Sequence, residues 1–389
     1  MKPLLIYFPL GHMANDWAPG SIWLLAPAIA ASMGLSPSEI GLLLAVHYMG
    51  AALGYLPAGI LSDRISHQGR LLAATFWWVA VGYFCASVAP GFWSLAILLA
   101  IAGMGDAAWH PIATGVLVEQ MPKRRGMVLG IHAMGGTLSE VGAPLSVGFL
   151  LAVFDWRTTL QISVIPAVIM GIVFVFFARH IPASDAKAVS RVELSQITRS
   201  WLKPGGLLLI GMISIYNMAL MALMSMAPLY LQTDLSYSPA ASGIVFATSM
   251  LLGSIMQPVI GRYSDSVDRH LVFIVGSILA IVCSTVAAMS TQPGLIVVAI
   301  VANMAILVGI RSSVLASAVE YASARAATTL GFVFVLLDGV GAIGAILAGY
   351  VGEIDLQYVL ALAGFLSLIS LLLSAILFTR RRSLPAGSY

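Results

Sequence analysis

The sequence is poor in charge and in cysteine. Only 9% of its 389 residues are charged, whereas 60% are hydrophobic and the mean hydropathy is +0.97. An ordinary soluble domain carries about 25% charged residues, so this composition excludes a water-soluble globule. The two cysteines, Cys85 and Cys283, both lie in apolar runs, and a disulfide framework is not expected.

Several functional motifs are also missing. The chain has no Walker A sequence, no nucleophile–base set and no metal-ligand cluster of recognisable spacing. GVGAIG at 339–344 matches a dinucleotide fingerprint only in its letters, since no strand precedes it and it falls in an apolar run. We therefore expect no enzyme activity, no cofactor and no bound metal. The net charge of +3 does not indicate a nucleic-acid partner, because the basic residues lie between apolar runs, where a membrane protein places them.

Long apolar runs are what the chain has in abundance. Each is about 20 residues or more, enough to cross a ~30 Å hydrocarbon core as a helix, and helices satisfy their own backbone groups there. The sequence predicts an all-α polytopic membrane protein with twelve transmembrane helices near residues 4–31, 39–62, 70–89, 92–120, 126–154, 157–178, 204–233, 239–264, 270–290, 293–322, 325–351 and 355–379.

The basic residues orient these spans. Of the 19 lysines and arginines, all except Arg157 and Arg311 fall on one side of the membrane, which the positive-inside rule assigns to the cytoplasm. We predict cytoplasmic N- and C-termini and a cytoplasmic central loop. The expected organisation is an N-terminal six-helix bundle (1–178), a linker (179–203), a C-terminal six-helix bundle (204–379) and a cytoplasmic tail (380–389).

The two halves repeat each other at a shift of about 201–202 residues. LSPSEIG at 35–41 aligns with YSPAASG at 237–243, GILSD at 59–63 with GRYSD at 261–265, and Asn15 falls on Asn217. Two parallel six-helix repeats are typical of transporters whose site lies near the middle of the membrane between the repeats. The chain is therefore predicted to carry a small-molecule substrate across the bilayer.

These residues resemble the major facilitator superfamily over the whole chain. GILSDRISHQGR at 59–70 is similar to its G-x-x-x-D-R-x-G-R-R signature, although Ser66, His67 and Gln68 depart from it. GGTLSEVGAPLSVG resembles the antiporter motif through Gly142, Pro144 and Gly148. Within the superfamily, GHMANDW at 11–17 and GMGDAAWHP at 103–111 are most similar to the fosmidomycin-resistance type of drug exporter.

Polar residues inside the spans are the candidate site, because a charge at the bilayer centre costs about 2.5–3.5 kcal/mol or more. In the first span, His12 and Asp16 are four apart and share a helix face with Asn15 beside them. The resemblance places this span on the transport path, so His12 and Asn15 are predicted to contact substrate and Asp16 to couple protons. The alternative is an internal hydrogen-bonded group that packs spans 1 and 5.

Spans 4 and 10 carry the next candidates. Asp106 and His110 also share a face and could carry a proton between them, or His110-Pro111 could simply bend the helix. Arg311 stays charged and suits an anionic substrate, or it forms a permanent salt bridge to Asp338 or Glu140. His110, Arg311 and Asn217 are assigned to substrate and Asp106 to the proton.

Spans 5 and 11 each carry one acid, Glu140 and Asp338. Both are predicted to take part in proton coupling, with structural pairing as the alternative. His132 and His47 are interpreted as ordinary hydrogen-bonded histidines. The resemblance assigns Asp63, Arg64 and Arg70 to a cytoplasmic gate; a solvated topology signal is the alternative.

The sequence thus predicts a proton-coupled secondary transporter that works by alternating access in a bacterial inner membrane as a monomer. The resemblance favours export of a small anionic or zwitterionic compound by proton antiport. Proton symport of an organic acid or similar metabolite into the cell is the first alternative. A membrane sensor or scaffold that moves nothing is the second, although the linker is too short for a folded signalling domain.

Overall fold

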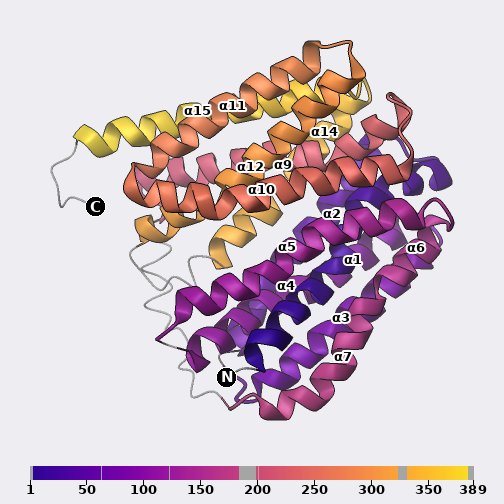
Figure 1. The fold of residues 1–389 in the computed structure, drawn as a ribbon, viewed down its shortest axis with the longest axis vertical. Helices are drawn as coiled ribbons and strands as arrows, with labels where there is room; N and C mark the ends of the chain where they lie inside the picture. Colours follow the sequence, from indigo (N-terminus) through magenta and orange to yellow (C-terminus); the bar gives the residue numbers. More distant parts are fainter. Residues whose placement is uncertain are drawn as a thin grey trace. The chain divides into compact units, whose positions relative to one another are not determined.

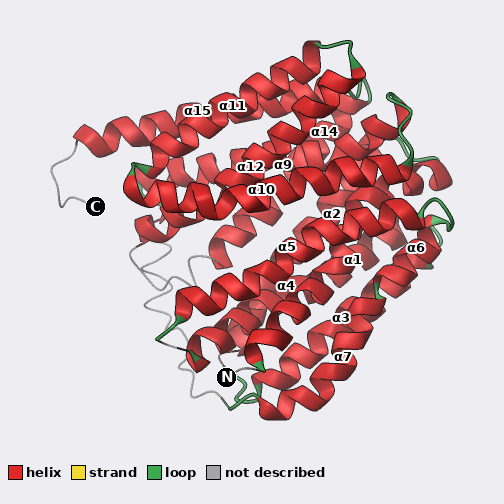
Figure 2. Ribbon diagram, viewed as in Figure 1, coloured by secondary structure: helices red, strands yellow, loops and turns green. Residues whose placement is uncertain are grey.

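The computed structural model describes residues 3–62, 64–121, 123–183, 199, 201–322 and 331–383. These residues form helices and loops and contain no strand (Figure 2). Figure 1 follows the chain through its helices, which are α1 (Leu4–Met33), α2 (Pro37–Ser62), α3 (Gln68–Ser87), α4 (Phe92–Gln120), α5 (Arg125–Leu150), α6 (Trp156–Ser163), α7 (Ile165–Phe177), η1 (Ala178–His180), α9 (Pro204–Thr233), α10 (Pro239–Ser266), α11 (Arg269–Met289), α12 (Pro293–Ala322), η2 (Val335–Val340), α14 (Ile343–Gly352) and α15 (Tyr358–Ser383).

The helices begin and end where local chemistry directs. Proline is the first residue of α2, α9, α10 and α12, a position where its missing N–H goes unused and its fixed φ suits the helix. Gly34 ends α1 with φ 66° and ψ 35° and donates its N–H to Ala30, and only glycine adopts this left-handed conformation without steric cost.

Twelve transmembrane helices result, as the sequence predicts. Ten helical stretches of the described residues are long and apolar enough to span a bilayer; among them Trp156–His180 is the sixth span predicted from the sequence and Gly331–Gly352 falls in the eleventh. Helices α1 and α5 complete the twelve. Both have ample length, at 30 and 26 residues, and both carry the histidines and acids that the candidate site uses.

Two spans that the sequence predicts as continuous are interrupted. The sixth divides at Val164 into α6 and α7, the second of which carries Pro166 in its first turn. The eleventh contains a π-helical turn, η2, in which Gly341 N–H donates to Leu336 O. The amide of Asn217 on α9 donates to Leu337 O in that turn. A side chain inserted into a helical ladder is a known cause of such a turn.

Contacts divide the described chain into two compact units. Unit 1 holds α1, most of α2, α3 to α7, η1, and the segment Tyr237–Ala247 that includes the start of α10. Unit 2 holds the segment Ser36–Leu42 that includes the start of α2, together with α9, the rest of α10, α11, α12, η2, α14 and α15. In unit 1, α1 packs on α5 and α3 on α4 and α7; in unit 2, α11 packs on α12 and α15, and α9 on α14 and α15.

An aromatic core fixes the helices of unit 1. Phe8 of α1, Phe76 of α3, Trp109 of α4 and Phe174 of α7 are completely buried. Their ring centroids lie 4.7 to 6.0 Å apart at tilted or edge-on angles, the arrangement that aromatic quadrupoles prefer. Because Phe8 is one turn before His12 and Trp109 immediately precedes His110, this core also holds the backbone of the polar residues beside it.

The loop between α5 and α6 is held by its own polar groups. Asp155 caps α6 by accepting hydrogen bonds from the backbone N–H of Thr158 (3.0 Å) and Arg157 (2.8 Å). These bonds, that of the Thr158 amide foremost, hold the pKa of Asp155 below its ordinary value. The Arg157 guanidinium donates to Ser87 O at 2.6 Å and lies 4.4 Å from the centre of the Trp156 ring, which ties α6 to the end of α3.

Helices α2 and α4 approach closely through glycine. A Cβ on Gly50 would lie 2.5 Å from Ala100 Cβ and 2.7 Å from Ala100 O, whereas a Cβ on Gly115 meets nothing within 4 Å. We predict that Gly50→Ala lowers the free energy of unfolding by about 1–3 kcal/mol through overpacking. Gly115→Ala should raise it by about 0.5–1 kcal/mol through helix propensity. Thermal unfolding of the two purified variants in one detergent measures this. Shifts of the same sign would contradict the packing described.

Candidate functional site

The polar residues of α1 form the centre of a cluster in unit 1. His12 Nε2 lies 3.2 Å from Asp16 Oδ2, and the two side chains are 13% and 22% exposed. The i, i+4 spacing brings them together on one face, as the sequence predicts. Partial exposure means that solvent or a small molecule can reach the pair.

The other ring nitrogen of His12 fixes the proton count of this pair. Nδ1 lies 2.9 Å from the backbone oxygen of His132 on α5, and a carbonyl only accepts, so Nδ1 carries a hydrogen. Nε2 then either donates a second hydrogen to the Asp16 carboxylate or accepts one from a neutral carboxyl group. In both arrangements one proton lies between Nε2 and Oδ2. Without it, a nitrogen lone pair would face a carboxylate oxygen.

Helix α4 supplies the rest of the cluster. Asn15 is fully buried and donates to Asp106 Oδ1 at 2.6 Å, Asp106 O at 3.2 Å and Asp16 Oδ1 at 3.3 Å. His110 Nε2 lies 3.8 Å from Asp16 Oδ1. We call His12, Asn15, Asp16, Asp106 and His110 the His12–Asp16 cluster. The structure thus brings together the five polar residues that the sequence singles out in spans 1 and 4.

Helix α5 contributes His132, which the sequence analysis interprets as an ordinary hydrogen-bonded histidine, and Glu140, which it assigns to proton coupling. The His132 ring, which is buried, stacks on the His12 ring with centroids 4.3 Å apart and planes at 20°. Glu140, two turns further along α5, is near enough to act electrostatically on His12. The HAMGG run at 132–136, with its two adjacent glycines in a helix, is the signal that would have pointed to this contact.

The cluster also has the donor set of a cation site. His12, Asp16 and His110 each offer a ligand atom within 4.8 Å of the others, and imidazole with carboxylate suits divalent metals such as Zn²⁺. In the structure these atoms are engaged with one another, as the His12–Asp16 and His110–Asp16 distances describe. We interpret the group as an ion-pair cluster, and the expectation of no bound metal stays a prediction.

The other assigned substrate and proton residues lie in unit 2. Asn217 is fully buried on α9 and is bonded to Leu337 O. Asp338 is the next residue of η2 and is 8% exposed. Arg311 is half-buried on α12, near enough to Tyr216 of α9 to act on it electrostatically. The Asn217 side chain on α9 therefore donates to the backbone of η2 at the residue before Asp338.

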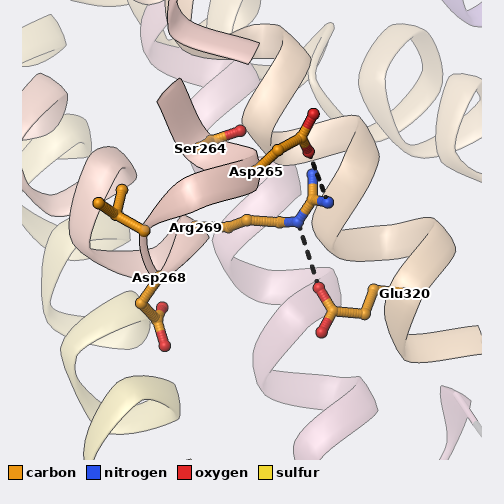
Figure 3. A pocket seen from close by; sticks show the side chains of 6 residues that line it. Ser264, Asp265, Asp268, Arg269 and Glu320 are labelled. Atoms are coloured by element: carbon orange, nitrogen blue, oxygen red, sulfur yellow. Dashed lines mark hydrogen bonds and ion pairs between the residues drawn. The ribbon is translucent and has the colours of Figure 1, made fainter. Parts of the chain in front are cut away.

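A second polar cluster in unit 2 joins α10, α11 and α12. Arg269 donates to Asp265 at 2.9 Å and lies 3.2 Å from Glu320 (Figure 3). Together with Ser264 and Asp268 these residues line an open cavity of about 450 Å³. With three acids to one arginine, the cavity is a poor place for an anion. Asp265 is the repeat counterpart of Asp63, so this cluster stands where the second copy of the signature loop was expected.

The first copy of that loop is only partly described. Asp63 lies outside the described residues, and Arg64 and Arg70 are both exposed. Their assignment to a cytoplasmic gate stays a prediction. His47, which the sequence analysis interprets as an ordinary histidine, is buried with its Nε2 2.6 Å from the hydroxyl of Tyr83.

Twelve membrane helices in two units, with ionisable side chains gathered inside one of them, define the class of secondary transporters. The sequence profile described as Major Facilitator Superfamily matches residues 10–338 and 207–388. The chain belongs to the major facilitator superfamily. It is a multi-pass membrane transporter of a small molecule, and not an enzyme.

Two relatives named as transporters share 22% to 30% of their aligned residues with this chain. The chain is 30% identical over 183 residues to the "Probable 4-methylmuconolactone transporter" of Cupriavidus pinatubonensis, a match that covers 46% of this chain and 41% of the relative. It is 22% identical over 275 residues to the "Hexuronate transporter" of Bacillus subtilis, covering 69% and 65%. These matches thus span less than two thirds of each relative.

A solved structure shares the whole fold. The bacterial homolog of the human lysosomal transporter Spinster, in its inward-facing and unoccupied conformation, superposes with a TM-score of 0.80 over 99% of both chains at 18% identity. At this identity the likeness shows the fold alone.

The Asn15 amide should be a main support of the cluster. We predict that Asn15→Leu lowers the free energy of unfolding by about 1–3 kcal/mol, because the partly buried carboxylates of Asp16 and Asp106 lose a donor. The double variant Asn15→Leu/Asp106→Leu should regain part of this loss, since it removes an acceptor along with the donor. Thermal unfolding in matched micelles compares the variants. A double variant less stable than the single one would contradict this account of the bond.

Proposed function

We propose that the protein is a proton-coupled transporter that exports a small anionic or zwitterionic compound by antiport, using alternating access. The N-terminal bundle (1–178) and the C-terminal bundle (204–379), joined by the linker 179–203, are the moving parts in this proposal. In this proposal the protein works as a monomer in a bacterial inner membrane, and both termini, including the tail (380–389), lie in the cytoplasm. The distribution of basic residues supports that orientation.

The observation that carries the proposal is the geometry of His12, whose Nδ1 lies 2.9 Å from His132 O and whose Nε2 lies 3.2 Å from Asp16 Oδ2, which calls for one proton between ring and carboxylate. A transporter couples to protons when a buried group must gain or lose one as the binding region changes its access. The His12–Asp16 pair meets this need because its geometry is stable with the proton and repulsive without it. Asp106, Glu140 and Asp338 are the further candidates for proton coupling, and Asp106 connects to the pair through Asn15.

Substrate contact is assigned to His12, Asn15, His110 and Arg311, with Asn217 as a supporting residue. Arg311 keeps its charge and offers a planar fork of donors that matches carboxylate or phosphonate. The named substrate of the Bacillus subtilis relative, hexuronate, is itself a small anion. The fixed positive charge of Arg311 in unit 2 and the titratable histidines of unit 1 each favour an anion that is exchanged against protons.

The direction of transport rests on motif resemblance. GHMANDW and GMGDAAWHP are similar to the fosmidomycin-resistance type of exporter, and span 5 carries Gly142, Pro144 and Gly148 of the antiporter motif. Import of an organic acid by proton symport is the second candidate function, and the Bacillus subtilis relative named for hexuronate supports its substrate class. The same proton pair would serve either direction.

A growth panel tests direction and substrate class together. A pump-deficient bacterial host would express the wild type, Arg311→Gln or the exposed control Arg262→Gln at matched membrane levels. The panel contains phosphonates, other antibacterial anions, cationic drugs, and organic acids as sole carbon sources. We expect wild type and Arg262→Gln to raise the inhibitory concentration of at least one anion about tenfold. Arg311→Gln should not, because the loss of one charged contact weakens binding by about tenfold.

The other outcomes are equally informative. New growth on an organic acid, or sensitisation to a toxic anion, would overturn export in favour of uptake. Protection against cationic drugs alone would contradict an anionic substrate. Equal protection by wild type and Arg311→Gln would remove Arg311 from the mechanism.

A further inference from the structure

We propose that His132, Gly135 and Gly136 of α5, here called the α5 socket, position His12 and thereby set how tightly the His12–Asp16 pair holds its proton. The inference rests on the proposed function for its consequence in transport, and on contacts within unit 1 for its structure. The three are positioning residues, since they act on the proton through His12.

The first contact is the carbonyl of His132. It accepts the Nδ1 hydrogen of His12 at 2.9 Å, which leaves Nε2 as the nitrogen that meets Asp16. A histidine that is bonded at one nitrogen has its tautomer and its ring orientation fixed at the other. Because the acceptor is a backbone atom in α5, it cannot rotate away as a side chain would.

The second contact is ring against ring. His132 stacks on one face of His12, while His110 meets that ring edge-on at 5.2 Å and 76°. The buried His132 ring is itself packed against Phe8 and Trp109 of the aromatic core, with centroids 6.4 and 6.3 Å away. The stack therefore transmits the rigidity of the core to the His12 ring.

The third contact explains the adjacent glycines. Glycine is a poor residue for the middle of a helix, so two in succession in α5 need a reason. A Cβ on Gly136 would lie 2.9 Å from His12 Cε1 and 3.0 Å from His12 Nε2. A Cβ on Gly135 would overlap the backbone oxygen of Pro9 and lie 2.9 Å from His12 Cβ. Gly136 thus leaves the space that the imidazole occupies, and Gly135 lets the α1 backbone that carries His12 approach α5.

Several charged groups act on His12 within unit 1. From α1 it meets Asp16, from α4 His110 and, through Asn15, Asp106, and from α5 His132 and Glu140. On α3, Tyr83 acts on Asp16. The socket alters none of these charges. It fixes the one geometric variable on which they depend, which is where Nε2 points.

Gly136→Ala isolates this variable. Its methyl group would push against the far end of the His12 ring and turn Nε2 away from Asp16, leaving every charge in place. Gly130→Ala is the matched control, because Gly130 is on the same helix and a Cβ there meets nothing within 4 Å. Each protein is labelled with ¹⁵N-histidine, purified in detergent and titrated by NMR, with His12→Gln to identify the His12 signals.

We expect wild type and Gly130→Ala to show His12 with a protonated Nδ1 and the same titration midpoint. In Gly136→Ala the pH at which His12 loses its second proton should fall by about one unit, a tenfold weaker hold on the proton. An unchanged His12 signal and midpoint in Gly136→Ala would overturn the socket, as would an equal shift in Gly130→Ala.

Transport separates this inference from the function on which it rests. The pH dependence of substrate flux in proteoliposomes should move with the NMR midpoint in Gly136→Ala and stay in place in Gly130→Ala. If the NMR midpoint moves and the flux profile does not, the socket stands and the proton-coupling role of His12–Asp16 is wrong. A folding defect is recognised by the loss of all histidine dispersion. His132→Leu, which removes the stacked ring and adds no atom at Gly136, then replaces Gly136→Ala as the test, and an unchanged His12 midpoint in it would overturn the socket.

Discussion

The absence of water in a hydrocarbon core is the constraint on which the structure depends. A polar group there must find its partner in the protein, since an unpaired one costs several kcal/mol. The Nδ2 group of Asn15 answers this by donating to Asp16 and to Asp106 from a fully buried position. The Nδ2 group of Asn217 answers it by donating to a backbone oxygen in a π-helical turn of the eleventh span.

The same constraint makes the His12–Asp16 pair a place for one proton. Both nitrogens of His12 face oxygens, one of them a carbonyl that only accepts. A hydrogen is therefore needed between His12 Nε2 and the Asp16 carboxylate, and a transported proton can supply it. Phe8 and Trp109 of the aromatic core pack against His132, which stacks on the His12 ring and limits its movement beside Asp16.

Much of this could be read from the sequence. Span length and charge scarcity predict twelve helices, and i, i+4 spacing places His12 with Asp16 and Asp106 near His110. These inferences succeed because they depend on local periodicity. The contacts across helices were not accessible in that way. That Asn15 joins α1 to α4, or that Arg269 of α11 meets Glu320 of α12, depends on which helix faces pack together.

The α5 contribution shows the limit most clearly. His132 carries its role through a backbone oxygen and a stacked ring, neither of which its residue type announces. Gly136 matters for the atoms it lacks. The break at Val164 and the π-helical turn near Asp338 likewise follow from tertiary contacts, because a hydropathy profile records that a span is apolar and not how its backbone is wound.

One measurement tests the proton pair most directly. Wild type, Asp16→Asn and the exposed control Asp234→Asn would be reconstituted in proteoliposomes with a substrate from the growth panel. Two fluxes are compared: substrate movement driven by an imposed pH gradient, and exchange of labelled for unlabelled substrate without a gradient. The account predicts that Asp16→Asn loses gradient-driven movement and keeps exchange, while Asp234→Asn keeps both. Retention of gradient-driven movement by Asp16→Asn would contradict it.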